Sequence, residues 1–214
     1  FAARQCLRCG LIYLSPRPTP TAIAAYYPDS YVPYRRAIQD EPNLLMRFMR
    51  RRRVRQRRRL VEQYTTTKSG RMLDVGASTG IFMDEMRSTG WQVFGIELSE
   101  SAAAYARNRL KLDIICTELS QAHLPSGYFD LITLWDVIEH TFDPRAVLVD
   151  IHRQLHDHGI IALTIPSWES LDRRVFGRYW IGYDAPRHLH VFPLQVIEDM
   201  LCDAGFVIEE NRTA

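Results

Sequence analysis

The sequence contains no apolar run long enough to cross a membrane, and no signal-peptide pattern at its start. It has only four cysteines, of which Cys6 and Cys9 lie close together. Such cysteine usage does not suggest a disulfide framework, so we expect a protein of a reducing compartment, the cytoplasm. The apolar fraction of 46% and the charged fraction of 24% are ordinary for a globular chain with a sizeable core.

Two familiar phosphate-binding motifs are also missing. The second and fifth residues after Gly76 are Ser78 and Ile81, so the dinucleotide fingerprint G-x-G-x-x-G is absent. The Gly-Lys-Ser/Thr ending of a Walker loop is absent as well. The stretch RMLDVGASTG, residues 71–80, instead contains D-x-G-x-x-x-G. This pattern points to a nucleoside ligand that carries an amino-acid tail.

The same stretch predicts a buried strand followed by a tight turn into a helix. Glycines at Gly76 and Gly80 allow a sharp bend and let a ligand approach the backbone closely. The start of the helix offers unpaired N–H groups to a polar or anionic ligand. Glu97 follows Gly76 by 21 residues, at the end of the next apolar run. A carboxylate in this place is expected to accept hydrogen bonds from ribose hydroxyls.

From residue 71 onward, apolar runs alternate with helical patterns. We expect strands at 71–75, 92–96, 113–116, 129–135, 159–165 and 206–210, and helices at 80–89, 100–110, 144–156 and 193–204. Ser99 is a candidate N-cap, and Asp143-Pro144 begins another helix. The alternation predicts an α/β, Rossmann-like, doubly wound and mostly parallel sheet with helices on both faces.

Three blocks of residues 71–210, namely LDVGASTG, GIELSE and FDLITLWDVIEHTFDP, resemble the class I S-adenosylmethionine-dependent methyltransferases in order and spacing. The resemblance implies S-adenosyl-L-methionine as methyl donor and S-adenosyl-L-homocysteine as product. Ser78 stands where a third glycine is common in the family, and we expect it only to crowd the ligand slightly. The implied cofactor-binding residues are Asp74, Gly76, Ala77, Gly80, Glu97, Leu98, Glu118, Trp135 and Asp136.

The acceptor side is expected in residues 166–192, which interrupt the alternation and are dense in Trp, Tyr, Arg and His. We interpret this insertion as a substrate lid for a small organic acceptor with a ring or sugar, methylated on oxygen or carbon. The candidate general bases are His140, His188 and His190. His188 and His190 also have the spacing of a metal pair, but no third ligand is evident, so no metal is predicted.

Cys6-x-x-Cys9 is half of a zinc-ribbon knuckle, and a closed zinc site needs four ligands. We expect free thiols here. Zinc is expected only with an intact N-terminus, since both ends look trimmed and some members of the family carry a further cysteine pair. The predicted organisation is an N-terminal arm over 1–42, a basic helix over 43–64, and a cofactor-binding domain over 65–214 that includes the lid.

The basic helix carries nine arginines and no acid between residues 47 and 59, whereas the whole chain has a net charge of only +2. It is either a solvated face with some arginines paired, or a docking surface for nucleic acid, anionic lipid or a phosphorylated substrate. An RNA or protein methyltransferase is therefore one alternative. Against nucleobase methylation, no Asn-Pro-Pro-Tyr-like tetrapeptide stands at Trp135. A non-catalytic cofactor-binding or zinc-ribbon interaction module is another alternative. The acceptor's identity and the oligomeric state stay open.

Overall fold

The structure is a computed structural model that describes residues 1–27 and 41–212, and the chain divides into two compact units. The first, here called the sheet unit, consists of residues 29–135 and 153–163. The second, here called the hairpin unit, consists of residues 1–28, 136–152 and 164–214. The predicted domain limits remain a prediction.

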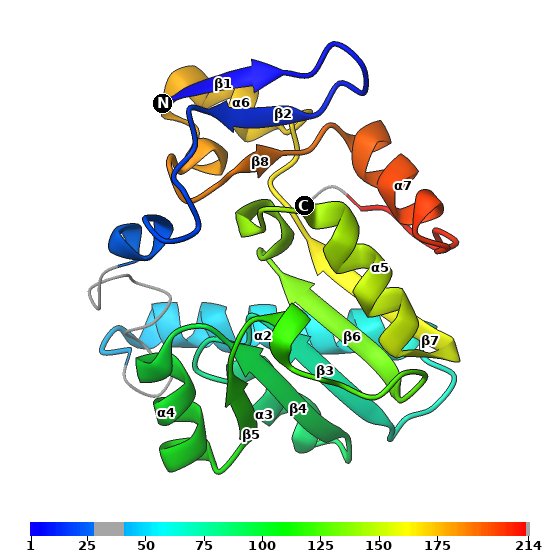
Figure 1. The fold of residues 1–214 in the computed structure, drawn as a ribbon. Helices are drawn as coiled ribbons and strands as arrows, with labels where there is room; N and C mark the ends of the chain where they lie inside the picture. The colour runs from blue at the N-terminus through cyan, green and yellow to red at the C-terminus, as the bar shows by residue number, and fades with distance from the viewer. Residues whose placement is uncertain (28–40, 213–214) are drawn as a thin grey trace. The chain divides into compact units, whose positions relative to one another are not determined.

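The sheet unit is built on five strands in the order β5-β4-β3-β6-β7 (Figure 1). β3 pairs in parallel with β4 and β6, and β4 pairs in parallel with β5. The order reverses at β3, so the crevice where open α/β sheets bind ligands lies at the carboxyl end of this strand. The strands are β3 (Arg71–Val75), β4 (Gln92–Glu97), β5 (Asp113–Cys116), β6 (Phe129–Trp135) and β7 (Leu155–Thr164). The predicted α/β fold is confirmed.

Among its described residues, the sheet unit has the helices α2 (Leu44–Tyr64), α3 (Ile81–Arg87) and α4 (Glu100–Leu110), together with the short turn η3 (Leu119–Gln121). The Ser99 hydroxyl accepts the Ala102 N–H, which confirms the predicted N-cap of α4. The Asn43 side chain caps α2 in the same way.

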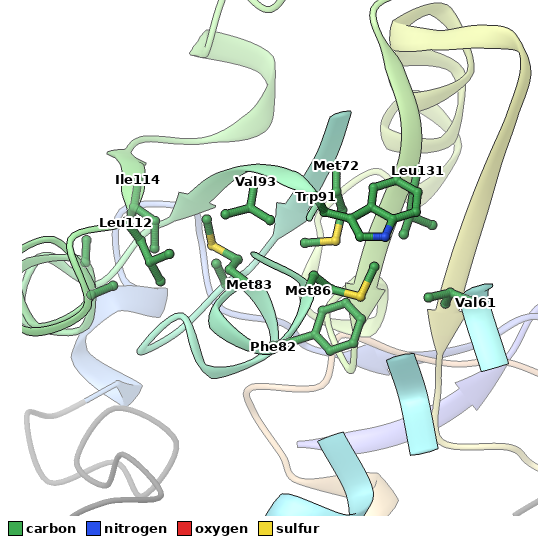
Figure 2. Packing of buried hydrophobic residues seen from close by; sticks show 13 residues of the cluster. Val61, Met72, Phe82, Met83, Met86, Trp91, Val93, Leu112, Ile114 and Leu131 are labelled. Atoms are coloured by element: carbon green, nitrogen blue, oxygen red, sulfur yellow. The ribbon is translucent and has the colours of Figure 1, made fainter. Parts of the chain in front are cut away.

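The core of the sheet unit lies between these helices and the sheet, as Figure 2 shows. Met72 and Leu131 come from neighbouring strands, while Phe82, Met83 and Met86 come from α3. All five side chains are buried, and Met72, Leu131, Met83 and Met86 are 0% exposed. Their burial fixes α3 against β3, which determines where the turn between them ends.

The hairpin unit contains a three-stranded antiparallel sheet, β1-β2-β8, that the sequence did not predict. The Cys6–Cys9 segment forms the turn between β1 (Ala2–Gln5) and β2 (Ile12–Ser15), and β8 is His190–Val191. All four cysteines are free thiols. The remaining elements are η1 (Ile23–Tyr26), η4 (Ile138–His140), α5 (Pro144–Gln154), α6 (Leu171–Phe176), η5 (Gly177–Tyr179), η6 (Ile181–Tyr183) and α7 (Leu194–Asp203).

One predicted strand is wrong. Residues 206–210 form no ladder, and Val207 is 84% exposed, because no strand among the described residues pairs with them. Phe206 instead packs edge-on against His152, with ring centroids 5.1 Å apart. The predicted boundary between the next helix and strand is also shifted. α5 ends at Gln154, and β7 begins at Leu155, four residues before the start of the predicted strand. Within residues 1–27 and 41–212, no helix is both long and apolar enough to span a bilayer.

The arginines of α2 serve partly as structural groups of the sheet unit. Arg58 donates to Glu62 at 2.7 Å and to Glu85 of α3 at 3.0 Å. The Arg57 guanidinium lies over the Trp135 ring, 4.5 Å from its centroid. These contacts fit the interpretation of α2 as a helix with some arginines paired. The docking role of its other arginines remains a prediction.

Candidate functional site

The turn after β3 has the backbone geometry of a ligand cradle. Gly76, Ser78 and Gly80 all have positive φ angles, of 71°, 50° and 75°. The N–H groups of Gly76 and Ala77 both donate to the Ile96 carbonyl, at 2.8 and 3.0 Å. The turn is thus tied to the end of β4, while Gly76 itself stays exposed. A ligand has direct access to this stretch of backbone.

Glu97 closes the same edge of the sheet from β4. One carboxylate oxygen accepts the Ser78 N–H and the other accepts the Ser99 N–H, each at 2.7 Å. The residue is only 5% exposed, and burial raises the pKa of its carboxyl against the opposing effect of these N–H donors. Each carboxylate oxygen can accept more than one hydrogen bond, so acceptor capacity remains for a ligand hydroxyl.

The Asp74 side chain is buried within the sheet and does not point into the open turn. Its Oδ1 accepts the Thr133 hydroxyl at 2.6 Å, across the register in which Asp74 of β3 faces Thr133 of β6. Burial raises the pKa of the Asp74 carboxyl to about 7, although the Thr133 hydroxyl and the Arg57 charge oppose the shift. The contact holds Asp74 at the base of the turn, and its predicted role in cofactor binding remains a prediction. The Thr133 partner was not foreseen.

The Asp74 carboxyl should make stability depend on pH. Its folded pKa of about 7 lies above the unfolded value, so its contribution is fully present below about pH 4 and is lost as pH rises through 7. We expect Asp74→Asn to flatten the fall in unfolding free energy between pH 4 and 8, and to be more stable than the wild type at pH 8 by on the order of 2–4 kcal/mol.

Denaturant unfolding at several pH values measures this dependence. Asp113→Asn is the matched control, because it removes the same charge at an exposed strand start and should leave the slope as in the wild type. Parallel slopes for the wild type and Asp74→Asn would contradict the assignment.

Trp135 ends β6 in the sheet unit and is held from two sides. Phe82 of α3 packs edge-on at a centroid distance of 5.0 Å, and Arg57 covers the other part of the ring system. The indole Nε1 is buried and has no hydrogen-bond partner among the described residues. A buried donor without a partner is costly, and it is the kind of group that a ligand satisfies. The Arg57 contact could not be foreseen, since nothing distinguishes this arginine within its run.

The other predicted cofactor residues of the sheet unit lie at the carboxyl ends of β3, β4 and β5. Ala77 is buried beneath the turn, whereas Leu98 is 66% exposed directly after Glu97. Glu118 is exposed, and its side chain makes no capping bond to η3. An exposed leucine beside the ribose-binding candidate offers apolar surface to a flat base. Glu118 has no described contact that favours a binding role over a solvated one.

Asp136 begins the hairpin unit in a left-handed conformation, with φ at 59°. Its N–H lies 3.1 Å from both the carbonyl and the hydroxyl of Thr164, and its Oδ1 accepts that hydroxyl at 3.0 Å. The residue is therefore fixed at the start of a loop that continues into η4. The family resemblance implies that Asp136 binds the cofactor, and this remains a prediction.

The structure brings together two of the three candidate bases. The rings of His140 and His188 meet edge to face, with centroids 4.6 Å apart, although the two residues are 48 positions apart in the sequence. Burial and the neighbouring His188 lower the pKa of His140 to about 4. Burial also lowers the pKa of His188. Both imidazoles are consequently neutral at pH 7.

His190, the third candidate base, belongs to β8 and is not part of the contact between His140 and His188. It pairs with Tyr13 in the antiparallel sheet, and its side chain is 5% exposed and packs near Phe192. Burial and the Arg17 charge lower its pKa to about 4. Its role as a base stays a prediction.

Sequence reasoning missed Glu139, the residue before His140. It is 0% exposed, and neither carboxylate oxygen has a hydrogen-bond partner among the described residues. Burial raises the pKa of its carboxyl to about 8. The signal was present as the acid–histidine pair in IEH, but only the fold shows that His188 joins it.

Known proteins resemble this chain in sequence and in fold. A family model described as a methyltransferase domain matches residues 46–211. A ubiquinone biosynthesis O-methyltransferase of Bradyrhizobium diazoefficiens is 26% identical over 152 residues, covering 66% of this chain and 60% of that protein. The chain thus spans less than two thirds of the length of this relative.

Solved structures show the same fold. A SAM-dependent methyltransferase from Archaeoglobus fulgidus matches with a TM-score of 0.61 and 19% identity, over 74% of this chain and 69% of that one. The [4+2]-cyclase SpnF matches with a TM-score of 0.60 and 23% identity, over 72% of this chain and 57% of that one. At these identities the likeness concerns the fold, which also hosts reactions other than methyl transfer.

Proposed function

Because this chain belongs to the class I S-adenosylmethionine-dependent methyltransferases, we propose that the whole protein transfers a methyl group to an oxygen or carbon of a small organic acceptor. The observation that supports the cofactor assignment most is Glu97. Its carboxylate is fixed by two N–H donors at the end of β4, one of them in the turn that follows β3. The backbone of the turn and a carboxylate that can accept hydrogen bonds from ribose hydroxyls therefore lie side by side at the same edge of the sheet.

The residues of the sheet unit fit S-adenosylmethionine. The exposed, left-handed Gly76 leaves room for close approach, Glu97 accepts ribose hydroxyls, and Leu98 offers apolar surface to the adenine. Trp135 presents a buried N–H that lacks a partner among the described residues. When bound, the cofactor supplies an electrophilic methyl group on a sulfonium. The chain contributes by holding the donor in one orientation and by fixing the turn through Asp74 and Glu97.

The acceptor side of the proposal rests on the hairpin unit. An acceptor hydroxyl must lose a proton during transfer, and His140 and His188 are neutral imidazoles able to accept one. The predicted lid, residues 166–192, exposes large apolar side chains on α6, η5 and η6, which are 56–83% exposed. They are Leu171, Val175, Phe176, Tyr179 and Ile181. Exposed apolar surface of this extent is typical of a binding region and supports an acceptor with an apolar ring.

Substitution on this surface should separate acceptor binding from folding. We expect Phe176→Ser to raise the KM for the acceptor by about tenfold, which corresponds to the loss of one partly buried ring contact. Its effect on stability should stay within about 0.5 kcal/mol, since the side chain is 56% exposed. Steady-state kinetics and denaturant unfolding measure the two quantities. Arg109→Ser, on α4 of the sheet unit, is the surface control and should leave the KM unchanged.

The proposed activity is tested with S-adenosylmethionine that carries a labelled methyl group and a panel of hydroxylated ring compounds and sugars. Label in the small-molecule fraction supports the proposal. Label only in added RNA or protein would favour docking through α2, and such transfer should weaken with salt. Cofactor binding without transfer to any acceptor would favour a non-catalytic module. A cytoplasmic location is part of the proposal and is supported by the free cysteines.

A further inference from the structure

Glu139, His140 and His188 form a compact group within the hairpin unit. Each offers one ligand atom, and these three atoms lie within 4.8 Å of one another. Glu139 is the key member, because its carboxylate is completely buried with neither oxygen hydrogen-bonded among the described residues. An ionised carboxylate in such a place is costly unless a cation or several donors face it.

Each of the two imidazoles has its Nδ1 beside a backbone carbonyl. His188 Nδ1 lies 2.8 Å from the Gly182 carbonyl, and His140 Nδ1 lies 3.1 Å from the Arg187 carbonyl. A carbonyl only accepts hydrogen bonds, so both contacts place the proton on Nδ1 and leave the Nε2 lone pair available. A carbonyl that holds the other ring nitrogen is the usual support of a metal-bound histidine. The Tyr27 hydroxyl also contacts His140 Nδ1, at 2.9 Å.

We propose that Glu139, His140 and His188 bind one divalent transition-metal ion through a carboxylate oxygen and two Nε2 atoms. Imidazole and carboxylate donors suit zinc, cobalt or manganese better than calcium. Donors around one such ion lie roughly 3–4 Å apart, so the group reaches bonding distance with small side-chain rotations. Asp184 stands nearby, 4.0 Å from His188 Nε2, but its carboxylate is held by Arg187.

The metal site also suggests how the acceptor is bound and activated. This catalytic role rests on the proposed function, whereas metal binding itself does not. Three protein ligands leave a coordination position open to water or to an oxygen of the acceptor. A hydroxyl bound there has a lower pKa and releases its proton to solvent more easily. With the ion bound, His140 and His188 are its ligands, and the proton of the acceptor passes to solvent instead of to one of the two imidazoles. The site favours an acceptor that presents a hydroxyl.

The test uses the full chain with Cys6→Ser and Cys9→Ser, which removes the competing thiol pair. After treatment with a chelator, it is titrated with Co²⁺ and followed by visible absorption and by the shift in Tm. We expect one ion per chain and a raised Tm. Glu139→Gln should weaken binding at least about 100-fold, as should His188→Gln. The matched control replaces the exposed pair His156 and His158 by asparagine and should bind as before.

Glu139→Gln keeps the shape of the side chain and replaces an ionisable carboxyl, whose pKa burial raises to about 8, by a neutral amide, so its apo form should fold about as well as the parent. Circular dichroism checks this. Co²⁺ binding that survives both Glu139→Gln and His188→Gln, or that is lost in the control, would overturn the proposal, and so would a folded parent that binds no Co²⁺. Neither cofactor nor acceptor is present, so failure here is distinct from failure of methyl transfer.

Discussion

Glu97→Ala should weaken the binding of S-adenosylhomocysteine at least about 100-fold. The substitution removes the acceptor for ribose hydroxyls, and it leaves the N–H groups of Ser78 and Ser99 without their carboxylate partner. Hydrogen bonds to a charged group contribute about 1.5–3 kcal/mol each, and about 2.7 kcal/mol corresponds to 100-fold in affinity. The turn after β3 also loses its tie to β4 at Ser78. Calorimetric titration measures the change.

Glu100→Gln is the matched control for this experiment. Glu100 lies three residues further on, in the first turn of α4, where its side chain is 67% exposed and pairs with Arg107 on the surface. Exposed ion pairs contribute little, so cofactor affinity should stay within about twofold of the wild type. Similar affinities for Glu97→Ala and Glu100→Gln would remove Glu97 from the binding site.

Gly80→Ala should destabilise the fold by about 2–4 kcal/mol. A Cβ atom here would collide with the Leu112 side chain and would lie 3.1 Å from the Ala106 Cβ. The residue also has a φ of 75°, which L-residues adopt only at a cost of about 1–2 kcal/mol. Overpacking of a core adds about 1–3 kcal/mol. Denaturant unfolding measures the loss. A loss of this size would show that Gly80 must be glycine because it packs closely against α4 and the start of β5.

Gly127→Ala separates the two contributions. Gly127 has a similar φ of 59°, but an added Cβ there would meet no atom within 4 Å. Its cost should therefore be the backbone cost alone, about 1–2 kcal/mol. Equal destabilisation by Gly80→Ala and Gly127→Ala would show that the contact with Leu112 contributes nothing.

Much of the sheet unit could be predicted because its parallel strands are buried on both faces. Residues 72–75 and 131–134 are almost wholly apolar, and the polar exceptions, Asp74 and Thr133, bond to each other. The position of Glu97 at the end of β4 could be predicted because the 21 positions from Gly76 to Glu97 are just enough for one helix and one strand. Whether these residues bind the cofactor is still a prediction that the experiments above test.

The hairpin unit could not be predicted, for a topological reason. Its sheet pairs Ile12 and Tyr13 with a two-residue strand near the other end of the chain, and two residues carry no periodicity. The grouping of Glu139 with His188 likewise depends on a loop that folds back, where the Leu189 N–H donates to the Glu139 carbonyl at 2.8 Å. Local patterns do not contain contacts of this kind.

Calorimetric titration of S-adenosylhomocysteine into the wild-type chain, with NAD as the control ligand, tests the central claim most directly. A turn with D-x-G-x-x-x-G, held by Glu97, should bind S-adenosylhomocysteine at a one-to-one ratio with micromolar affinity and should not bind NAD. A folded chain that binds NAD, or that binds neither ligand, would contradict the cofactor assignment and the methyl transfer proposed from it.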